Sequence, residues 1–169
     1  MGCAGGAACR ASRPRQDRYD RGNDCVEERG PALKLCVVDA SVIGPMILPD
    51  EADLMPAGLE PVMVEGRALV PQHWRLEVLN LARMALRRKR IDHRQLEKAL
   101  ASLSQYRIHV DEGTNVHAWG ACMRLAQRHD LTAYDAAYIE LAKRVDAPLL
   151  TLDKALAKAA RHEKLELIA

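Results

Sequence analysis

The hydrophobic positions of the chain alternate between short apolar runs and longer stretches with helical spacing. The short runs, rich in β-branched and aliphatic residues, predict strands at 33–38, 67–70, 106–110, 148–151 and 165–168. The longer stretches predict helices at 71–88, 92–103, 114–129, 133–145 and 154–161, with short broken helices within 52–65. This alternation predicts an α/β domain whose central, mostly parallel sheet of about four to five strands is flanked by helices.

Local signals predict where several helices begin. Ser41 is a candidate cap for the helix after the first strand, and Pro71 would occupy a favoured first helical position. Asp92 is followed three residues later by a glutamine, which is the spacing of a capping box. Gly44-Pro45 interrupts the first helix early. These signals divide the chain into short elements joined by short connections.

The first 32 residues have a different composition from the rest. Glycine, arginine, aspartate and proline dominate them, and no helical or strand period is visible. We therefore expect residues 1–32 to form a disordered N-terminal tail and residues 33–169 to form one folded domain. A domain of that length is large enough to bury a full core.

Composition limits the modes of nucleic-acid binding. Only 4% of the residues are aromatic and there is no phenylalanine, so a protein that reads bases mainly by stacking them on aromatic platforms is not expected. The formal net charge is +2, so RNA binding would need a local basic patch. The run Arg87–Arg90 is one candidate for phosphate contacts, and a solvated helix end that favours cations is the alternative.

The five cysteines form no C-x-x-C pair and no zinc-ligand spacing. This scatter is typical of proteins in a reducing compartment, so we expect a cytoplasmic location. No apolar run approaches the length that crosses a membrane.

Four acidic residues occupy positions that a parallel sheet brings to one edge. Asp39 and Asp153 follow predicted strands, and Glu77 and Asp135 lie in the first turns of predicted helices. Strand ends and the helix starts that follow them share the carboxyl edge of such a sheet, where α/β proteins bind ligands. Clustered carboxylates repel one another, and a hard cation such as Mg²⁺ or Mn²⁺ removes that conflict. The pattern indicates metal-assisted hydrolysis of a phosphodiester.

Each acid also has a purely structural interpretation. Asp39 and Asp153 could cap the helices that follow them, and Glu77 could be a first-turn acid favoured by the helix dipole. Thr132 and Asp135 have the spacing of a capping box. Only the joint pattern of the four acids favours the functional interpretation.

The sequence segments around these acids resemble those of the PIN-domain family, specifically of the VapC-type toxins of toxin–antitoxin pairs. The four similar segments are Val37-Val38-Asp39-Ala40-Ser41, Arg75-Leu76-Glu77-Val78-Leu79-Asn80, Leu131-Thr132-Ala133-Tyr134-Asp135-Ala136-Ala137 and Leu149-Leu150-Thr151-Leu152-Asp153. The resemblance covers about residues 34–168, and as a set the four segments are specific.

The resemblance implies a Mg²⁺-dependent endoribonuclease, with Mn²⁺ as a possible substitute, that cleaves RNA and is inhibited by a cognate VapB-like antitoxin. It also implies a homodimer. It assigns Asp39 and Asp135 as metal ligands, and Glu77 and Asp153 as the acids that complete the catalytic set. Ser41 and Thr151 would support that set by hydrogen bonds.

Three other functions remain open from the residues alone. One is a different Mg²⁺-dependent α/β phosphoryl-transfer domain, although Ser41 stands where a haloacid-dehalogenase-type site needs a second aspartate and Asp153 stands where a receiver domain needs a lysine. Another is a binding module that keeps the fold without catalysis. The third is a metal-free ribonuclease using His109 and His117.

Overall fold

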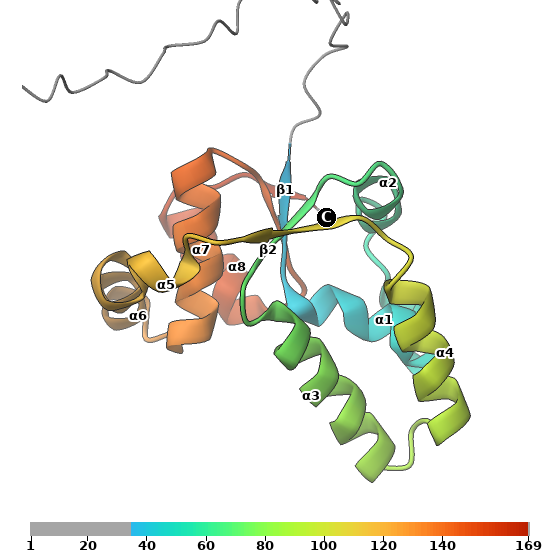
Figure 1. The fold of residues 1–169 in the computed structure, drawn as a ribbon. Helices are drawn as coiled ribbons and strands as arrows, with labels where there is room; N and C mark the ends of the chain where they lie inside the picture. The colour runs from blue at the N-terminus through green and yellow to red at the C-terminus, as the bar shows by residue number, and fades with distance from the viewer. Residues whose placement is uncertain (1–34, 169) are drawn as a thin grey trace, which may run out of the picture. The chain divides into compact units, whose positions relative to one another are not determined.

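The computed structural model describes residues 35–168, so the predicted tail at 1–32 lies outside the described residues and its boundary stays a prediction. Five parallel strands form one sheet in the order β3-β2-β1-β4-β5 (Figure 1). The strands are β1 (Cys36–Val38), β2 (Ala68–Pro71), β3 (Ile108–Asp111), β4 (Leu149–Leu150) and β5 (Leu167–Ile168). The predicted α/β class and parallel sheet are confirmed.

The central strand β1 is short and completely buried. Its three residues are each 0% exposed, and Val37 aligns with Leu69 on β2 and with Leu149 on β4. Strands of a parallel sheet are covered on both faces, which explains why β1 is apolar throughout instead of alternating.

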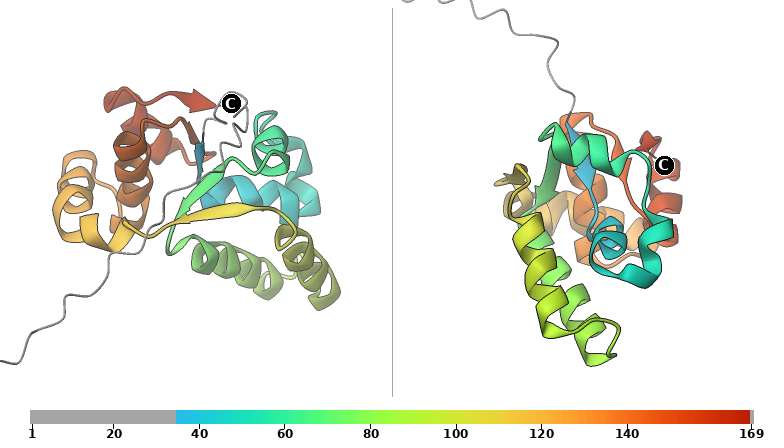
Figure 2. Two further views of the ribbon diagram at one scale, coloured as in Figure 1. Left: turned by 45° about the horizontal axis from the view of Figure 1, so that its top comes forward. Right: turned by 90° about the vertical axis from the view of Figure 1, so that its right-hand side faces the viewer.

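Helices cover both faces of the sheet. Figures 1 and 2 show the segments between β1 and β3 on one side and those after β3 on the other. The first group contains η1 (Ala40–Ile43), α1 (Gly44–Ile47), η2 (Pro49–Leu54), α2 (Leu59–Val64), α3 (Trp74–Arg87) and α4 (His93–Leu103). The second group contains α5 (Thr114–His117), the π-helical segment η3 (Ala118–Cys122), α6 (Met123–His129), α7 (Ala133–Val145) and α8 (Lys154–His162).

The strand order creates a reversal point beside β1. The chain runs outward from β1 through β2 to β3, and then returns to place β4 on the other side of β1. In open parallel sheets such a reversal leaves a crevice outside the carboxyl ends of the two central strands. The fold therefore predicts a ligand site at the ends of β1 and β4.

Helix α7 is the central helix of the second group and contacts β1, β2 and β4. Its residues 136–142 are all buried, among them Tyr138 and Ile139 at 0% exposure. A helix that is buried on most of its circumference belongs to the core, and its small alanines let it approach the sheet closely. This packing fixes the first turn of α7 next to the carboxyl edge.

Two of the predicted helix starts are wrong. Ser41 makes no capping hydrogen bond to η1, because its hydroxyl is used elsewhere, and Pro71 is the last residue of β2 while α3 begins at Trp74. The expected interruption at Gly44-Pro45 is the point where 3-10 helix η1 becomes α1. The capping box at Asp92 is present in full, with hydrogen bonds in both directions to Gln95. Among the helices within 35–168, none is long and apolar enough to cross a membrane.

Candidate active site at the carboxyl edge of the sheet

Asp39 lies directly after β1 and is 6% exposed. Its Oδ2 accepts hydrogen bonds from the Ser41 hydroxyl at 2.5 Å and from the Thr151 hydroxyl at 2.6 Å. Ser41 in turn accepts a hydrogen bond from the backbone N–H of Leu152 at 2.9 Å. The ends of β1 and β4 thus hold the Asp39 carboxylate between them, and the role of Ser41 and Thr151 in supporting a catalytic set stays a prediction.

Burial is the main influence on the charge of Asp39. It raises the pKa of Asp39 because the carboxylate loses hydration, while the hydrogen bonds from Ser41 and Thr151 lower it. The negative charge of Asp135 raises it further, and the net shift is upward. Asp39 is therefore a carboxylate whose negative charge is poorly compensated by its surroundings.

Glu77 lies in the first turn of α3, as predicted, with a side chain that is 29% exposed. Its Oε2 accepts a hydrogen bond from the Tyr138 hydroxyl at 2.5 Å, which ties α3 to α7. Burial raises the pKa of Glu77, the charges of Asp39 and Asp135 raise it further, and the Tyr138 hydrogen bond lowers it. Because the charge of Asp135 acts on Asp39 and the charges of both act on Glu77, the three acids share one electrostatic environment.

Asp135 lies in the first turn of α7. Thr132 is the N-cap of this helix, because its Oγ1 accepts a hydrogen bond from the Asp135 backbone N–H at 3.1 Å. The Thr132 hydroxyl donates to Asp135 Oδ2 at 2.7 Å. A capping box would have the carboxylate accept the backbone N–H of residue 132, and here it accepts the hydroxyl proton instead. Thr132 thus orients the Asp135 carboxylate, but the carboxylate does not cap the backbone N–H of residue 132.

Asp153 does take the structural role considered for it. It is exposed, and its Oδ1 accepts a hydrogen bond from the backbone N–H of Leu156 at 2.7 Å, as the N-cap of α8. Its own backbone N–H donates to Thr151 Oγ1 at 3.0 Å, and the Thr151 hydroxyl in turn donates to Asp39. Thr151 thus connects the backbone of Asp153 to the Asp39 carboxylate. The structure places Asp153 at the rim of the site with its carboxylate engaged in a cap.

Oxygen atoms dominate the ligands that this edge could offer a metal ion. Carboxylates and hydroxyls without thiolate suit a hard divalent cation such as Mg²⁺ or Mn²⁺ better than zinc. Within 35–168, no group of three or more His, Cys, Asp or Glu side chains converges closely enough to hold one ion. Each carboxylate is hydrogen-bonded to its own neighbours instead. The donor chemistry fits the predicted metal, and the assignment of Asp39 and Asp135 as its ligands stays a prediction.

Two residues next to the acids were not singled out from the sequence. Tyr138 donates to Glu77, and the Nε2 of His73 lies 3.5 Å from Glu77 Oε2. Burial lowers the pKa of His73, which favours its neutral form. Helical spacing gave a signal for both, because His73 lies one turn before Glu77 and Tyr138 lies three residues after Asp135.

The other candidate residues lie in different surroundings. Arg90 of the basic run is paired with Asp50 at 2.7 Å and Glu51 at 2.6 Å, so this cation connects the end of α3 to η2. His109 contacts the carbonyl oxygen of Gly66 at 3.0 Å, and His117 lies 3.5 Å from Glu140. The two histidines are thus engaged by different neighbours, one by a loop carbonyl and one by an acid of α7.

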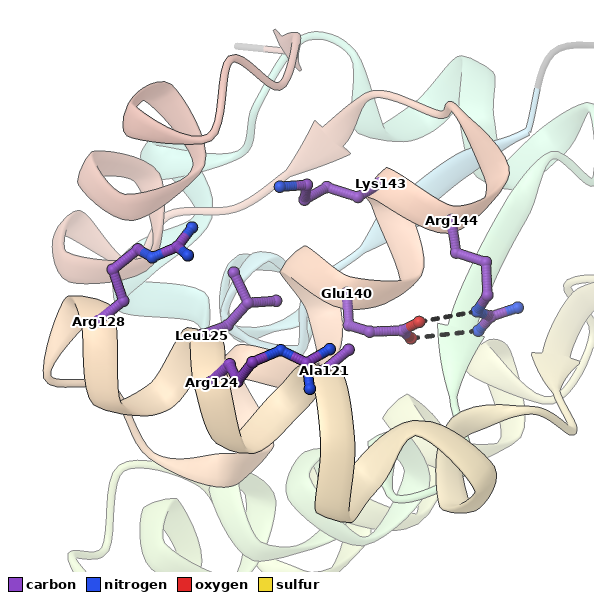
Figure 3. Close-up of a pocket in the computed structure, with 7 residues that line it drawn as sticks. All are labelled: Ala121, Arg124, Leu125, Arg128, Glu140, Lys143 and Arg144. Carbon is purple, nitrogen blue, oxygen red and sulfur yellow. Dashed lines mark hydrogen bonds and ion pairs between the residues drawn. The ribbon is translucent and has the colours of Figure 1, made fainter.

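A second charged region lies between α6 and α7. A cavity of about 350 Å³ lies there, bordered by four cationic side chains. Figure 3 shows these side chains, with Glu140 paired to Arg144. The cations are Arg124, Arg128, Lys143 and Arg144. Arg144 also binds Asp111 at 2.8 Å, and both Arg128 and Lys143 bind Glu163. Most of the positive charge around this cavity is therefore neutralised within the protein.

Comparisons with known proteins agree with this architecture. Ribonuclease VapC3 of Pyrobaculum aerophilum is 28% identical to the chain over 130 residues, which is 72% of this chain and 92% of that protein. The crystal structure of PAE2754 from Pyrobaculum aerophilum superposes with a TM-score of 0.51 at 22% identity, covering 75% of this chain and 86% of the other, and shows the same fold. Residues 36–162 match the sequence profile of the PIN domain. The predicted family is therefore confirmed, and the chain belongs to the PIN-domain family.

Proposed function

We propose that the protein is a metal-dependent endoribonuclease of the VapC type, with Mg²⁺ as the expected ion and Mn²⁺ as a substitute. The observation that carries the proposal is the placement of Asp39 after β1, Glu77 in the first turn of α3 and Asp135 in the first turn of α7. Burial raises the pKa of Asp39 and Glu77, and the charges of neighbouring acids raise both further. The name of the similar Ribonuclease VapC3 supports RNA as the substrate. A divalent cation, when bound, would offset charge at the phosphoryl oxygens and lower the pKa of water.

The chain's own residues would orient the carboxylates for this chemistry. Ser41 and Thr151 donate hydrogen bonds to Oδ2 of Asp39, which would fix the orientation of this carboxylate toward a cation. The Tyr138 hydroxyl donates to one oxygen of Glu77, and the Thr132 hydroxyl donates to one oxygen of Asp135. We assign Asp39 and Asp135 as the metal ligands, Glu77 as a catalytic acid beside them, and Asp153 as the fourth acid at the rim.

The partners follow from the same proposal. A VapC-type toxin would be inhibited by a cognate VapB-like antitoxin, would act as a homodimer and would work in the cytoplasm. These statements rest on the sequence resemblance and on the named relative. Co-expression with the protein encoded by an adjacent short gene, followed by size-exclusion chromatography, would test for a complex.

A non-catalytic binding module is the alternative that deserves a direct test, because the PIN fold alone does not determine activity. The purified full chain should cleave single-stranded RNA, lose that activity in EDTA, and regain it when excess Mg²⁺ or Mn²⁺ is added. Asp135→Asn should abolish the metal-restored cleavage, whereas Glu97→Gln, which changes an exposed acid on α4, should not. Cleavage that survives chelation would exclude the metal mechanism, and an inert protein with intact fold would favour the binding module.

A further inference from the structure

A pocket of about 300 Å³ lies beside the acidic site, between the β2–α3 turn, the α5–η3 segment and the start of α7. We call it the Tyr134 pocket. Its lining includes Gln72, His73, Asn115, Ala118, Ala133 and Tyr134. Its volume is at the small end of the range for ligand pockets, which suits one ring system better than a large ligand.

The pocket adjoins the acids through shared residues. His73 lines the pocket and lies 3.5 Å from the Glu77 carboxylate. Tyr134 lines it too, and is the residue before Asp135. The rings of His73 and Tyr134 pack edge to face with centroids 5.2 Å apart. A group in the pocket would therefore be one side chain away from the carboxylates.

The shape of the pocket favours a flat apolar group. Tyr134 is 61% exposed, so part of its ring is accessible to a bound group. Three other lining residues are alanines, whose small side chains leave width for a ring, namely Ala118, Ala133 and Ala137. Ala118 and Cys122 are the two ends of the π-helical segment η3, an irregularity often found at functional sites.

The polarity of the pocket favours a neutral group with hydrogen-bonding edges. Gln72 and Asn115 are exposed and bring amides, which both donate and accept hydrogen bonds. No Asp, Glu, Lys or Arg is among the described residues that line the pocket, and His73 has a lowered pKa. A phosphate or a charged peptide side chain would find no opposite charge there, whereas a nucleobase would find a stacking surface and amide partners.

We propose that the Tyr134 pocket binds the base of the nucleotide next to the phosphate that is cleaved, with Tyr134 stacking on the base and Gln72 and Asn115 contacting its edges. This inference rests on the proposed nuclease function, because that function supplies RNA at the neighbouring carboxylates. The pocket would then contribute to which nucleotide the enzyme prefers at the cleavage site. A single tyrosine suffices here, so the low aromatic content of the chain is no obstacle.

The test measures base binding without relying on cleavage. The full chain is titrated with the 5′-monophosphates of adenosine, guanosine, cytidine and uridine, and with ribose 5-phosphate, which has the same sugar and phosphate but no base. Amide NMR shifts at residues 133–137 and at Asn115 report binding. At least one nucleotide should give saturable shifts at these residues, and ribose 5-phosphate should not.

Variants then separate stacking from other effects. Tyr134→Leu should weaken nucleotide binding by about tenfold, as expected for loss of one stacked base, while Tyr134→Phe should bind like the wild type. Trp119→Leu is the matched control, because Trp119 is 97% exposed but lies outside the pocket. Its affinity should be unchanged.

Three results would overturn the proposal: equal shifts with ribose 5-phosphate, no shifts with any of the four nucleotides, or unchanged binding in Tyr134→Leu. RNA cleavage with and without EDTA is measured on the same preparation, so the two proposals fail separately. If the chain binds bases here but does not cleave RNA, the proposed pocket is supported and the proposed nuclease function is contradicted. If the chain is a metal-dependent nuclease but Tyr134→Leu does not change its nucleotide affinity, the nuclease function is supported and the proposed pocket is contradicted.

Discussion

Carboxylates occur in two contrasting settings in this protein. At the carboxyl edge of the sheet, Asp39 and Glu77 have raised pKa values, because burial and neighbouring acids disfavour their charge. Beside α6 and α7, Glu163 has a pKa lowered to about 2, chiefly by hydrogen bonds from Lys143 and His129. Asp111 also has a lowered pKa: burial of the carboxyl group raises it, and the Arg144 guanidinium together with hydrogen bonds from Thr114 and Gly113 lowers it by more.

The contrast teaches how one residue type can serve stability or function. The protein provides its own cations for Glu163 and Asp111, so their negative charge stabilises the fold. It provides Asp39 and Glu77 with hydroxyl hydrogen-bond donors and, beside Glu77, the neutral His73, but neither carboxylate has a Lys or Arg partner among the described residues. Their charge is left for an external cation to compensate, and carboxylates with perturbed pKa values gather at functional sites.

The largest expected effect comes from removing the charge of Asp39. Asp39→Asn should lower metal-dependent RNA cleavage by about a thousandfold, since a metal ion contributes several kcal/mol to the stabilisation of charge in the transition state. Because the pKa of Asp39 is raised in the folded state, its ionisation opposes folding at pH 7. Without metal, the variant should therefore be at least as stable as the wild type at pH 7, and this advantage should vanish as the pH falls below the unfolded pKa, about 3.9.

Cleavage rates, and urea unfolding in the presence of EDTA, measure these two effects. Asp53→Asn, at an exposed position of η2, is the control and should change neither. A variant that is less stable without metal but still cleaves RNA would show that Asp39 stabilises the fold, as Glu163 and Asp111 do. The contrast between the two settings would then be wrong.

A moderate effect is expected at Glu163. Its side chain is 7% exposed and contacts Arg128, His129 and Lys143. Glu163→Gln should lower the free energy of unfolding at pH 7 by about 1–2 kcal/mol, because hydrogen bonds to charged groups are lost, and should leave the rate of RNA cleavage unchanged.

The pH dependence gives the sign of this contribution. The folded-state pKa is depressed, so the stabilisation by Glu163 is complete above the unfolded pKa, about 4.3, and is lost as the pH falls toward the folded value of about 2. The difference in unfolding free energy between wild type and Glu163→Gln should shrink over that interval. A difference that stays constant with pH would mean that the charge of Glu163 is not what stabilises the fold.

The smallest effect is expected at Asp153, which lies between the two settings because it is at the rim of the site but caps α8. Asp153→Asn should keep the cap, and should reduce cleavage by no more than about tenfold if the charge acts only from the rim. Asp153→Ala should also lower the free energy of unfolding by about 1 kcal/mol through loss of the cap. A collapse of cleavage in the Asn variant, with unchanged thermal stability, would add Asp153 to the central carboxylates.

The sequence by itself determined the order of strands and helices in this protein. Apolar runs such as 36–38 and helical spacing depend on neighbours a few residues away, so the pattern predicted the parallel α/β sheet correctly. It also placed Glu77 and Asp135 correctly in the first turns of their helices. Local chemistry was sufficient for the capping box at Asp92, whose two partners are only three residues apart.

Only the tertiary structure decided how the carboxylates are held. The Ser41 hydroxyl could cap its own helix or bind Asp39, and the choice depends on Thr151 and Leu152, which come from a strand end more than a hundred residues away. Tyr138 reaches Glu77 because α7 packs against β1 and β2, which brings together two residues 61 positions apart in the sequence, and helical spacing within α7 cannot reveal that contact. The pKa values of these acids depend on burial and on charges from separate elements, so they are properties of the assembled fold.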